Sequence, residues 1–170
     1  VTRVRDLVID LLGMGGTKVS SAIPDMATFY FPRFGADPRY GLHLMRPLDY
    51  SCYAGASVFL STPSDLVRFG MAVTGGTLLR PETVELLQTS QRLTSGAETG
   101  YGLGWDVETV SLAGEETRVV GHDGDALGGM VASLMIFPDH DIVVAVTTNL
   151  SYADTFAVGL RIAEAFAPTR

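Results

Sequence analysis

The sequence predicts a domain of the α/β class (α+β type) in which an antiparallel sheet of three to four strands is flanked by helices. Two patterns carry this prediction. Apolar residues recur at helical spacing near the start, in the middle and at the end of the chain. Between the middle and last helical segments lie apolar stretches typical of strands, and the last two are joined by the tight turn 138–141.

The first expected helix begins at the first residue, its apolar positions recur from Val4 to Leu12, and Gly13 is a typical helix end. A chain that opens inside a regular element is expected to be cut from a longer one. From Gly15 to about Tyr53 the periodicity disappears among four prolines and seven aromatic residues. We expect a long ordered loop here that could carry short strands, because long structureless loops are uncommon in compact domains.

The next helix has well-marked boundaries. Thr62 is a good N-cap, Pro63 suits the first helical position, and Asp65 follows three residues after the cap. The glycine pair 75–76 predicts the end of this helix. A second short helix is expected from Pro81 to about residue 88.

After these helices, the sequence predicts four strands and then a final helix. Strands are predicted at Tyr101–Val110, Thr117–His122, Met130–Phe137 and Ile142–Asn149, and a closing helix at about Ala153–Phe166.

Composition excludes several classes of protein. The 170 residues include 12 Lys and Arg against 19 Asp and Glu, so the net charge is −7, and 46% of the residues are hydrophobic. This balance excludes intrinsic disorder and argues against nucleic acid as the main partner, because an acidic chain repels phosphates. No apolar run approaches the roughly 20 residues of a membrane span. Cys52 is the only cysteine, which excludes an intrachain disulfide and a multi-cysteine zinc site.

The most unusual segment surrounds His122. This residue ends the predicted strand, and Asp123, Gly124 and Asp125 follow before a glycine pair. A histidine at a strand end beside glycine can reach a ligand, and adjacent backbone N–H groups can point at an anion. The alternative is a surface turn with a capping histidine.

Two kinds of chemistry find little support in the residues alone. His122, Asp123 and Asp125 are metal-ligating types, so a metal-dependent hydrolase stays an alternative, but we expect no metal site. No Gly-x-Ser-x-Gly or Ser-x-x-Lys motif is present, so covalent catalysis has no evident nucleophile within this sequence.

Four segments, in this order, resemble the serine β-lactamase-like superfamily: AGASVFLSTPSDLVRFG, LLRPETVELLQTSQ, GYGLGW and GHDGDALGGMVASLMIFPDHDIVVAVTTN. The resemblance is nearest to class C β-lactamase-related esterases, D-amino-acid peptidases and LACTB-type proteins, and it includes penicillin-binding-protein-like members. It covers nearly the whole chain, most clearly from Ala54 to Asn149.

The resemblance implies a serine hydrolase that acts through an acyl-enzyme. Of the three catalytic motifs of that family, only the third is present, as His122-Asp123-Gly124. Residues 1–170 would then be the C-terminal portion of a single β-lactamase/transpeptidase-like catalytic domain, inactive alone, with the Ser-x-x-Lys and Tyr motifs in an N-terminal portion. The helices of residues 62–88 would lie beside the active-site side of the sheet. A non-catalytic binding or scaffold member of the same fold is the alternative.

The implied roles are limited to matched positions. His122 would position the substrate and shape proton transfer, Gly124 would allow close approach, and the backbone N–H of Asp125 would be one oxyanion-hole donor. Asp123 stands where threonine or serine is usual, and its charge would repel a substrate carboxylate. This favours ester or amide hydrolysis over true β-lactamase activity.

The remaining expectations concern the pocket and the partners. Tyr50, Tyr53 and Trp105 could line the pocket or belong to the core. The expected partners are a small-molecule or peptide-like substrate and the missing N-terminal portion, and neither nucleic acid, membrane nor cofactor is expected. A cut domain would also expose a sheet edge through which the chain could associate.

Overall fold

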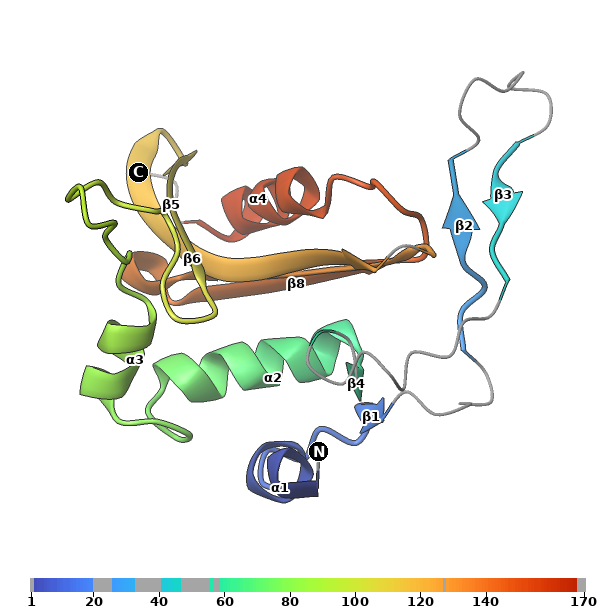
Figure 1. Ribbon diagram of the computed structural model, residues 1–170, viewed down its shortest axis with the longest axis horizontal. Helices are drawn as coiled ribbons and strands as arrows, with labels where there is room; N and C mark the ends of the chain where they lie inside the picture. Colours follow the sequence, from blue (N-terminus) through green and yellow to red (C-terminus); the bar gives the residue numbers. More distant parts are fainter. Residues whose placement is uncertain are drawn as a thin grey trace.

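The computed structural model of the chain describes residues 2–19, 26–32, 41–46, 56, 59–126 and 128–167. Its centre is a four-stranded antiparallel sheet in the order β5-β6-β7-β8 (Figure 1). The strands are β5 (Asp106–Leu112), β6 (Glu115–Ala126), β7 (Met130–Phe137) and β8 (Ile142–Thr148). The predicted antiparallel sheet is thereby confirmed.

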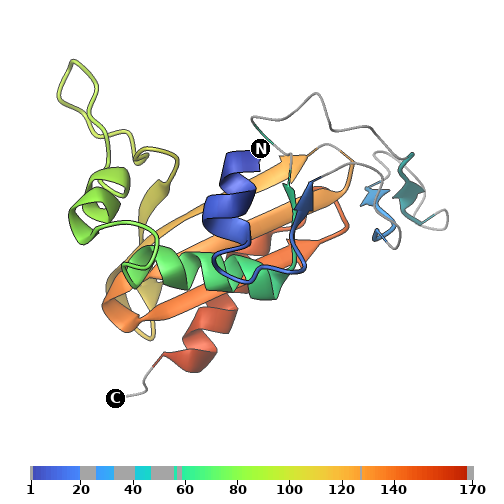
Figure 2. The ribbon, with the colours of Figure 1, turned by 90° about the horizontal axis from the view of Figure 1, so that it is seen from below.

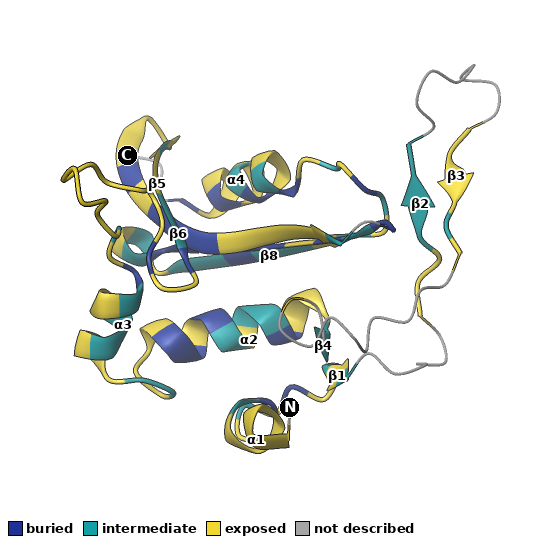
Figure 3. Ribbon diagram, viewed as in Figure 1, coloured by how far each residue is buried: buried dark blue, intermediate teal, exposed yellow. Residues whose placement is uncertain are grey.

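Helices cover the two faces of this sheet. Helix α4 (Thr155–Phe166) packs on β7 and β8 from one side, and α2 (Pro63–Thr74) packs on the same strands from the other. Figure 2, a view from below, shows α2 in front of the sheet and α4 behind it. Figure 3 shows that buried residues concentrate in the two layers between the helices and the sheet. Two apolar cores result, one beneath each helix.

Helix α2 begins where its capping residues predict. The hydroxyl oxygen of Thr62 accepts a hydrogen bond of 3.2 Å from the backbone N–H of Asp65, and Pro63 is the first helical residue. The short helix α3 (Pro81–Leu87) follows, also with proline at its start. Both helices therefore follow from local sequence signals.

Small residues bring each long helix close to the sheet. A Cβ atom at Gly70 of α2 would lie 2.7 Å from a methyl carbon of Val143 in β8. A Cβ atom at Gly159 of α4 would overlap the sulfur of Met135 in β7. The apolar faces of both helices therefore sit close to the strands, which is how a small domain reaches interior packing density.

Two strand boundaries differ from the prediction by four residues or more. The strand expected at Thr117–His122 continues to Ala126, so the residues after His122 form strand and not a glycine-rich loop. Aspartate and glycine disfavour strands, but here they pair with Ser133, Ala132 and Val131 of the strongly apolar β7. The strand expected to begin at residue 101 begins instead at residue 106.

The first part of the chain forms short elements around this core. Helix α1 (Thr2–Val4) continues as a π-helix, η1 (Arg5–Ile9). Strand β1 (Lys18–Val19) pairs with β4 (Phe59–Leu60), and β2 (Tyr30–Phe31) pairs with β3 (His43–Leu44). The loop was thus correctly expected to carry short strands. Within the described ranges, no helix has both the length and the apolar character needed to cross a membrane.

Candidate active site

His122 lies in the middle of β6, opposite Leu134 of β7. Side chains alternate between the two faces of a strand, so His122 shares the α2 face with Val120. Val120 and Leu134 belong to the core beneath α2, whereas His122 is exposed. The imidazole therefore emerges beside this core.

A large groove opens at this point. Its volume is about 1010 Å³, and His122, Asp123, Gly124 and Ala126 border it from β6. The other walls come from β7, the end of β8, the start of α2, and the segments 15–18 and 26–29. Lys18, Ser61 and Asn149 add polar groups to a mostly apolar lining. Most ligand sites combine these properties.

Polar contacts hold one wall of the groove in place. The Asp65 carboxylate is buried at the start of α2, where Arg68 pairs with it at 2.6 Å. The Thr17 hydroxyl donates a hydrogen bond of 3.0 Å to the same carboxylate and lies 2.7 Å from the Ser61 hydroxyl. These contacts attach the segment 15–18 to α2 and thereby fix Lys18 at the groove.

The groove runs along an open edge of β6. The ladder between β5 and β6 ends with the pair Asp106 and Gly121. Among the described residues, no strand pairs with positions 122–126 on the β5 side. An edge of this kind presents backbone N–H and C=O groups to whatever occupies the groove.

The register shows which backbone groups face this open edge. A two-residue turn with positive φ at Ala113 and Gly114 joins β5 to β6, which makes Leu112 and Glu115 the hydrogen-bonded pair that closes the hairpin. The backbone N–H and C=O groups of successive residues point to opposite edges of a strand. In β6, those of the odd-numbered residues point toward β5. Beyond Gly121, the N–H group of Asp125 therefore faces the open edge.

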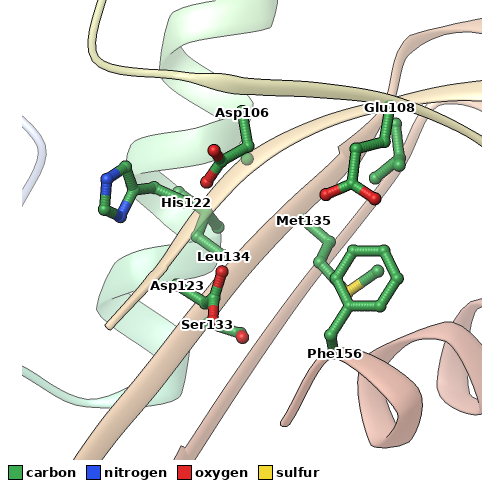
Figure 4. Close-up of a pocket in the computed structure, with 10 residues that line it drawn as sticks. Asp106, Glu108, His122, Asp123, Ser133, Leu134, Met135 and Phe156 are labelled. Atoms are coloured by element: carbon green, nitrogen blue, oxygen red, sulfur yellow. The ribbon is translucent and has the colours of Figure 1, made fainter. Parts of the chain in front are cut away.

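The side chain of Asp123 lies on the other face of the sheet. Its partner Ser133 has a hydroxyl 2.8 Å from the hydroxyl of Thr155 in α4, which identifies the α4 face. In Figure 4 the His122 ring and the Asp123 carboxylate leave the strand in different directions. The repulsion expected between Asp123 and a substrate carboxylate requires both on one face, so this arrangement weakens that argument.

A small cavity beside Asp123 adjoins the groove and shares His122, Asp123, Ser133 and Leu134 with its lining. Figure 4 shows its lining, which includes Glu108, Ser133 and Phe156. Its volume is about 20 Å³, enough for a single water molecule. Of the two, only the groove has room for a molecule larger than water.

The glycines around His122 differ in what surrounds them. A Cβ atom at Gly121 would overlap the carbonyl oxygen of Leu134, so the strand requires glycine there for packing. At Gly124 nothing lies within 4 Å of the Cβ position. The open space at Gly124 leaves room for the close approach of a ligand.

Tyr101 is a neighbour of His122 that sequence reasoning missed. Their ring centroids are 6.1 Å apart at an interplanar angle of 75°. The backbone of Tyr101 is held by hydrogen bonds of 3.1 Å to the Thr99 hydroxyl and 2.8 Å from the N–H of Gln91. The tyrosine was interpreted as a strand residue, and the only signal was its place between glycines in GYGLGW.

The other predicted pocket residues fall elsewhere. Trp105 is 9% exposed and stacks on Phe69 of α2 at 6.4 Å, so it belongs to the core, one of the two roles left open for it. Tyr50, Tyr53 and Cys52 lie outside the described residues.

The geometry does not support the alternative of a metal-dependent hydrolase that uses His122, Asp123 and Asp125 as ligands. His122 and Asp123 occupy opposite faces, and the Asp125 carboxylate already accepts hydrogen bonds from Ser151 and Tyr152. In the part of the chain that the structure describes, no three His, Cys, Asp or Glu side chains gather closely enough to hold a metal ion.

Comparison with known proteins identifies the family. The family model described as Beta-lactamase matches residues 2–167. The chain belongs to the beta-lactamase family. This agrees with the superfamily resemblance of the sequence, and comparison with curated proteins gives no match.

Several solved structures share the fold of this beta-lactamase-family chain. A D-stereospecific amidohydrolase from Streptomyces sp. is 22% identical with a TM-score of 0.72, covering 92% of this chain and 46% of its own. An octameric penicillin-binding protein homologue from Pyrococcus abyssi is 20% identical with a TM-score of 0.73, covering 95% and 36%. D-amino acid amidase from Ochrobactrum anthropi SV3 is 18% identical with a TM-score of 0.62, covering 97% and 48%. The chain spans less than half the length of each.

Proposed function

We propose that the chain is the C-terminal portion of the catalytic domain of a serine hydrolase that cleaves ester or amide bonds through an acyl-enzyme. The observation that carries this proposal is that His122 borders the groove on the segment of β6 whose β5 side is unpaired among the described residues, the side toward which the register directs the Asp125 N–H. An N-terminal portion supplies the serine nucleophile and its proton acceptor. This chain alone is inactive.

The residues of this chain have separate roles in the proposed reaction. His122 orients the substrate and assists proton transfer at the leaving group. The Asp125 N–H donates to the oxyanion that forms when the serine attacks the carbonyl carbon, and the serine's own N–H completes the pair. Gly124 leaves space for the substrate beside the strand.

The groove suits a small-molecule or peptide-like substrate. Its volume of about 1010 Å³ exceeds that of a single amino acid, and its lining is largely apolar. An extended peptide could also pair with the open edge of β6 through backbone hydrogen bonds. The names of two solved relatives, an amidohydrolase and an amidase, support amide hydrolysis over β-lactam hydrolysis.

The missing N-terminal portion is the proposed macromolecular partner. In the described part of the chain, β8 pairs only with β7 and so has a second open edge. Near the chain start, Val4, Leu7 and Leu11 follow helical spacing and are each 45% to 62% exposed. We assign these surfaces to contact with the rest of the domain, since exposed apolar patches mark interaction sites.

The test is hydrolysis by the protein that contains this chain. With nitrophenyl esters and D-amino-acid amides as substrates, His122→Gln should lower kcat at least about 100-fold, the usual scale of lost acid–base assistance. The matched control is His140→Gln, in the turn at the far end of β7, which should retain full activity. Equal activity of His122→Gln and the parent would overturn the role of His122. Absence of hydrolysis by the parent would instead favour the binding-protein alternative.

A further inference from the structure

The carboxylate of Asp125 is held on the α4 face of the sheet, opposite to the face that carries the His122 side chain. The Ser151 hydroxyl donates a hydrogen bond of 3.0 Å to Oδ1, and the backbone N–H of Tyr152 donates one of 2.7 Å to Oδ2. Each carboxylate oxygen therefore has its own donor. Two such bonds fix the orientation of the whole side chain.

Ser151 connects this carboxylate to two further segments. It is 1% exposed, and its hydroxyl oxygen accepts a hydrogen bond of 2.9 Å from the N–H of Gly129 in the turn between β6 and β7. Its own backbone N–H donates to the carbonyl oxygen of Tyr30 in β2 at 3.1 Å. The end of β6, the following turn, the segment after β8 and β2 thus share one network, which we name the Asp125 clamp.

The surrounding backbone is shaped to allow this clamp. A Cβ atom at Gly129 would lie 2.7 Å from the backbone nitrogen of Tyr30, so only glycine permits the close approach. Tyr152 has φ of 62°, a left-handed conformation that non-glycine residues rarely adopt. Its N–H is one of the two donors to Asp125, so the clamp holds this residue in place.

The end of β6 needs such support for a specific reason. Among the residues that the structure describes, the strand has only one neighbour beyond Gly121, and Asp-Gly-Asp is a poor strand sequence. Segments of this kind open locally more readily than a sheet interior. An oxyanion donor must nevertheless keep within a narrow range of positions to stabilise the transition state.

We propose that the Asp125 carboxylate is a positioning residue: from the α4 face it holds the backbone N–H of the same residue at the groove edge. The inference rests on the proposed function, in which that N–H is the oxyanion donor. It assigns a task to an acidic side chain that neither faces the groove nor contacts substrate.

The first test measures backbone order by amide hydrogen exchange in the protein that contains this chain. Asp125→Asn keeps the shape of the side chain but replaces one acceptor oxygen by an NH2 donor. Ser151→Ala removes the hydroxyl that donates to the Asp125 carboxylate. Both should speed exchange at Gly124, Ala126 and Tyr152 about tenfold or more, while exchange in the centre of β7 stays unchanged. The control Asp139→Asn changes an exposed carboxylate in the turn after β7 and should leave all these rates unaltered. Unaltered exchange in both clamp variants would overturn the inference.

The second test separates kcat from KM. Complete removal of one oxyanion donor costs roughly 10²–10³ in rate, so a displaced donor in Asp125→Asn should lower kcat about 10- to 100-fold. KM should change by less than about threefold, since the interaction is made in the transition state. An unchanged kcat in an otherwise active protein would overturn only the positioning role. No hydrolysis by the parent would overturn the proposed function, and this inference with it.

Discussion

At the scale of single residues, the adjacent residues His122 and Asp123 have different surroundings, because successive side chains of a strand point to opposite faces of the sheet. Both residues border the groove, but the His122 side chain lies on the α2 face, whereas that of Asp123 lies on the face of Ser133 and α4. The sequence predicted that His122 would reach a ligand site. It could not predict that Asp123 and Asp125 turn away, because their place in a strand depends on pairing with β7. Tyr101 was missed since its contact with His122 joins residues 21 positions apart.

The contact with Tyr101 gives a prediction for the orientation of His122. Tyr101→Leu removes the aromatic ring and should lower kcat about 2- to 10-fold, the equivalent of one edge-to-face ring pair. Tyr101→Phe keeps the ring and should stay near the parent. Steady-state kinetics on a nitrophenyl ester, together with the ¹H shifts of the His122 ring, measure the effect. Equal kinetics and His122 ring shifts in all three proteins would show that the contact does not orient the histidine.

At the scale of elements, local sequence signals predicted the start of a helix that has its own capping residues. They failed to predict the end of a strand whose length depends on pairing with a neighbouring strand. Thr62 and Pro63 placed the start of α2 at the observed residue. Strand β6 extends four residues past its predicted end at His122 and reaches Ala126. Its Asp-Gly-Asp segment has low strand propensity, which pairing with the apolar β7 overrides.

The contact between β6 and β7 gives a prediction for stability. Gly121→Ala introduces a methyl group against the Leu134 carbonyl oxygen, a backbone atom that can move only with its strand. We expect the free energy of unfolding to fall by about 1–3 kcal/mol, as for other overpacked sites. Gly124→Ala is the matched control, since its Cβ meets open space, and should change stability by no more than about 0.5 kcal/mol. Urea unfolding followed by Trp105 fluorescence measures both, and equal midpoints would contradict the predicted overlap.

At the scale of the whole molecule, the chain has the sheet and two helix layers of its family but leaves apolar surface uncovered. Its mean hydropathy is +0.25, and Figure 3 shows exposed residues along α1 and on the outer side of α4. The order of its four family-like segments predicted the fold correctly, because together they contain most of α2, all of α3 and the three neighbouring strands β6, β7 and β8 in part or in full. The nucleophile could not be located, since the motif that would carry it does not occur in this sequence.

The uncovered surface predicts that the isolated chain self-associates. Sedimentation velocity should show species larger than 18.1 kDa that grow with concentration. Leu7→Glu combined with Leu11→Glu places charges on the exposed side of the first helix and should shift the distribution toward monomer. Lys18→Glu changes charge without removing apolar surface and serves as the control. A parent chain that stays monomeric at all concentrations would contradict this prediction.

Labelling by a fluorophosphonate tests the central claim most directly. We predict that the protein with its N-terminal portion gains one covalent adduct at a serine outside residues 1–170, and that the isolated chain gains none. Intact-mass measurement and peptide mapping locate the adduct. An adduct on any serine of this chain, or none on the longer protein, would contradict the assignment of this chain as the non-nucleophilic portion of a serine hydrolase.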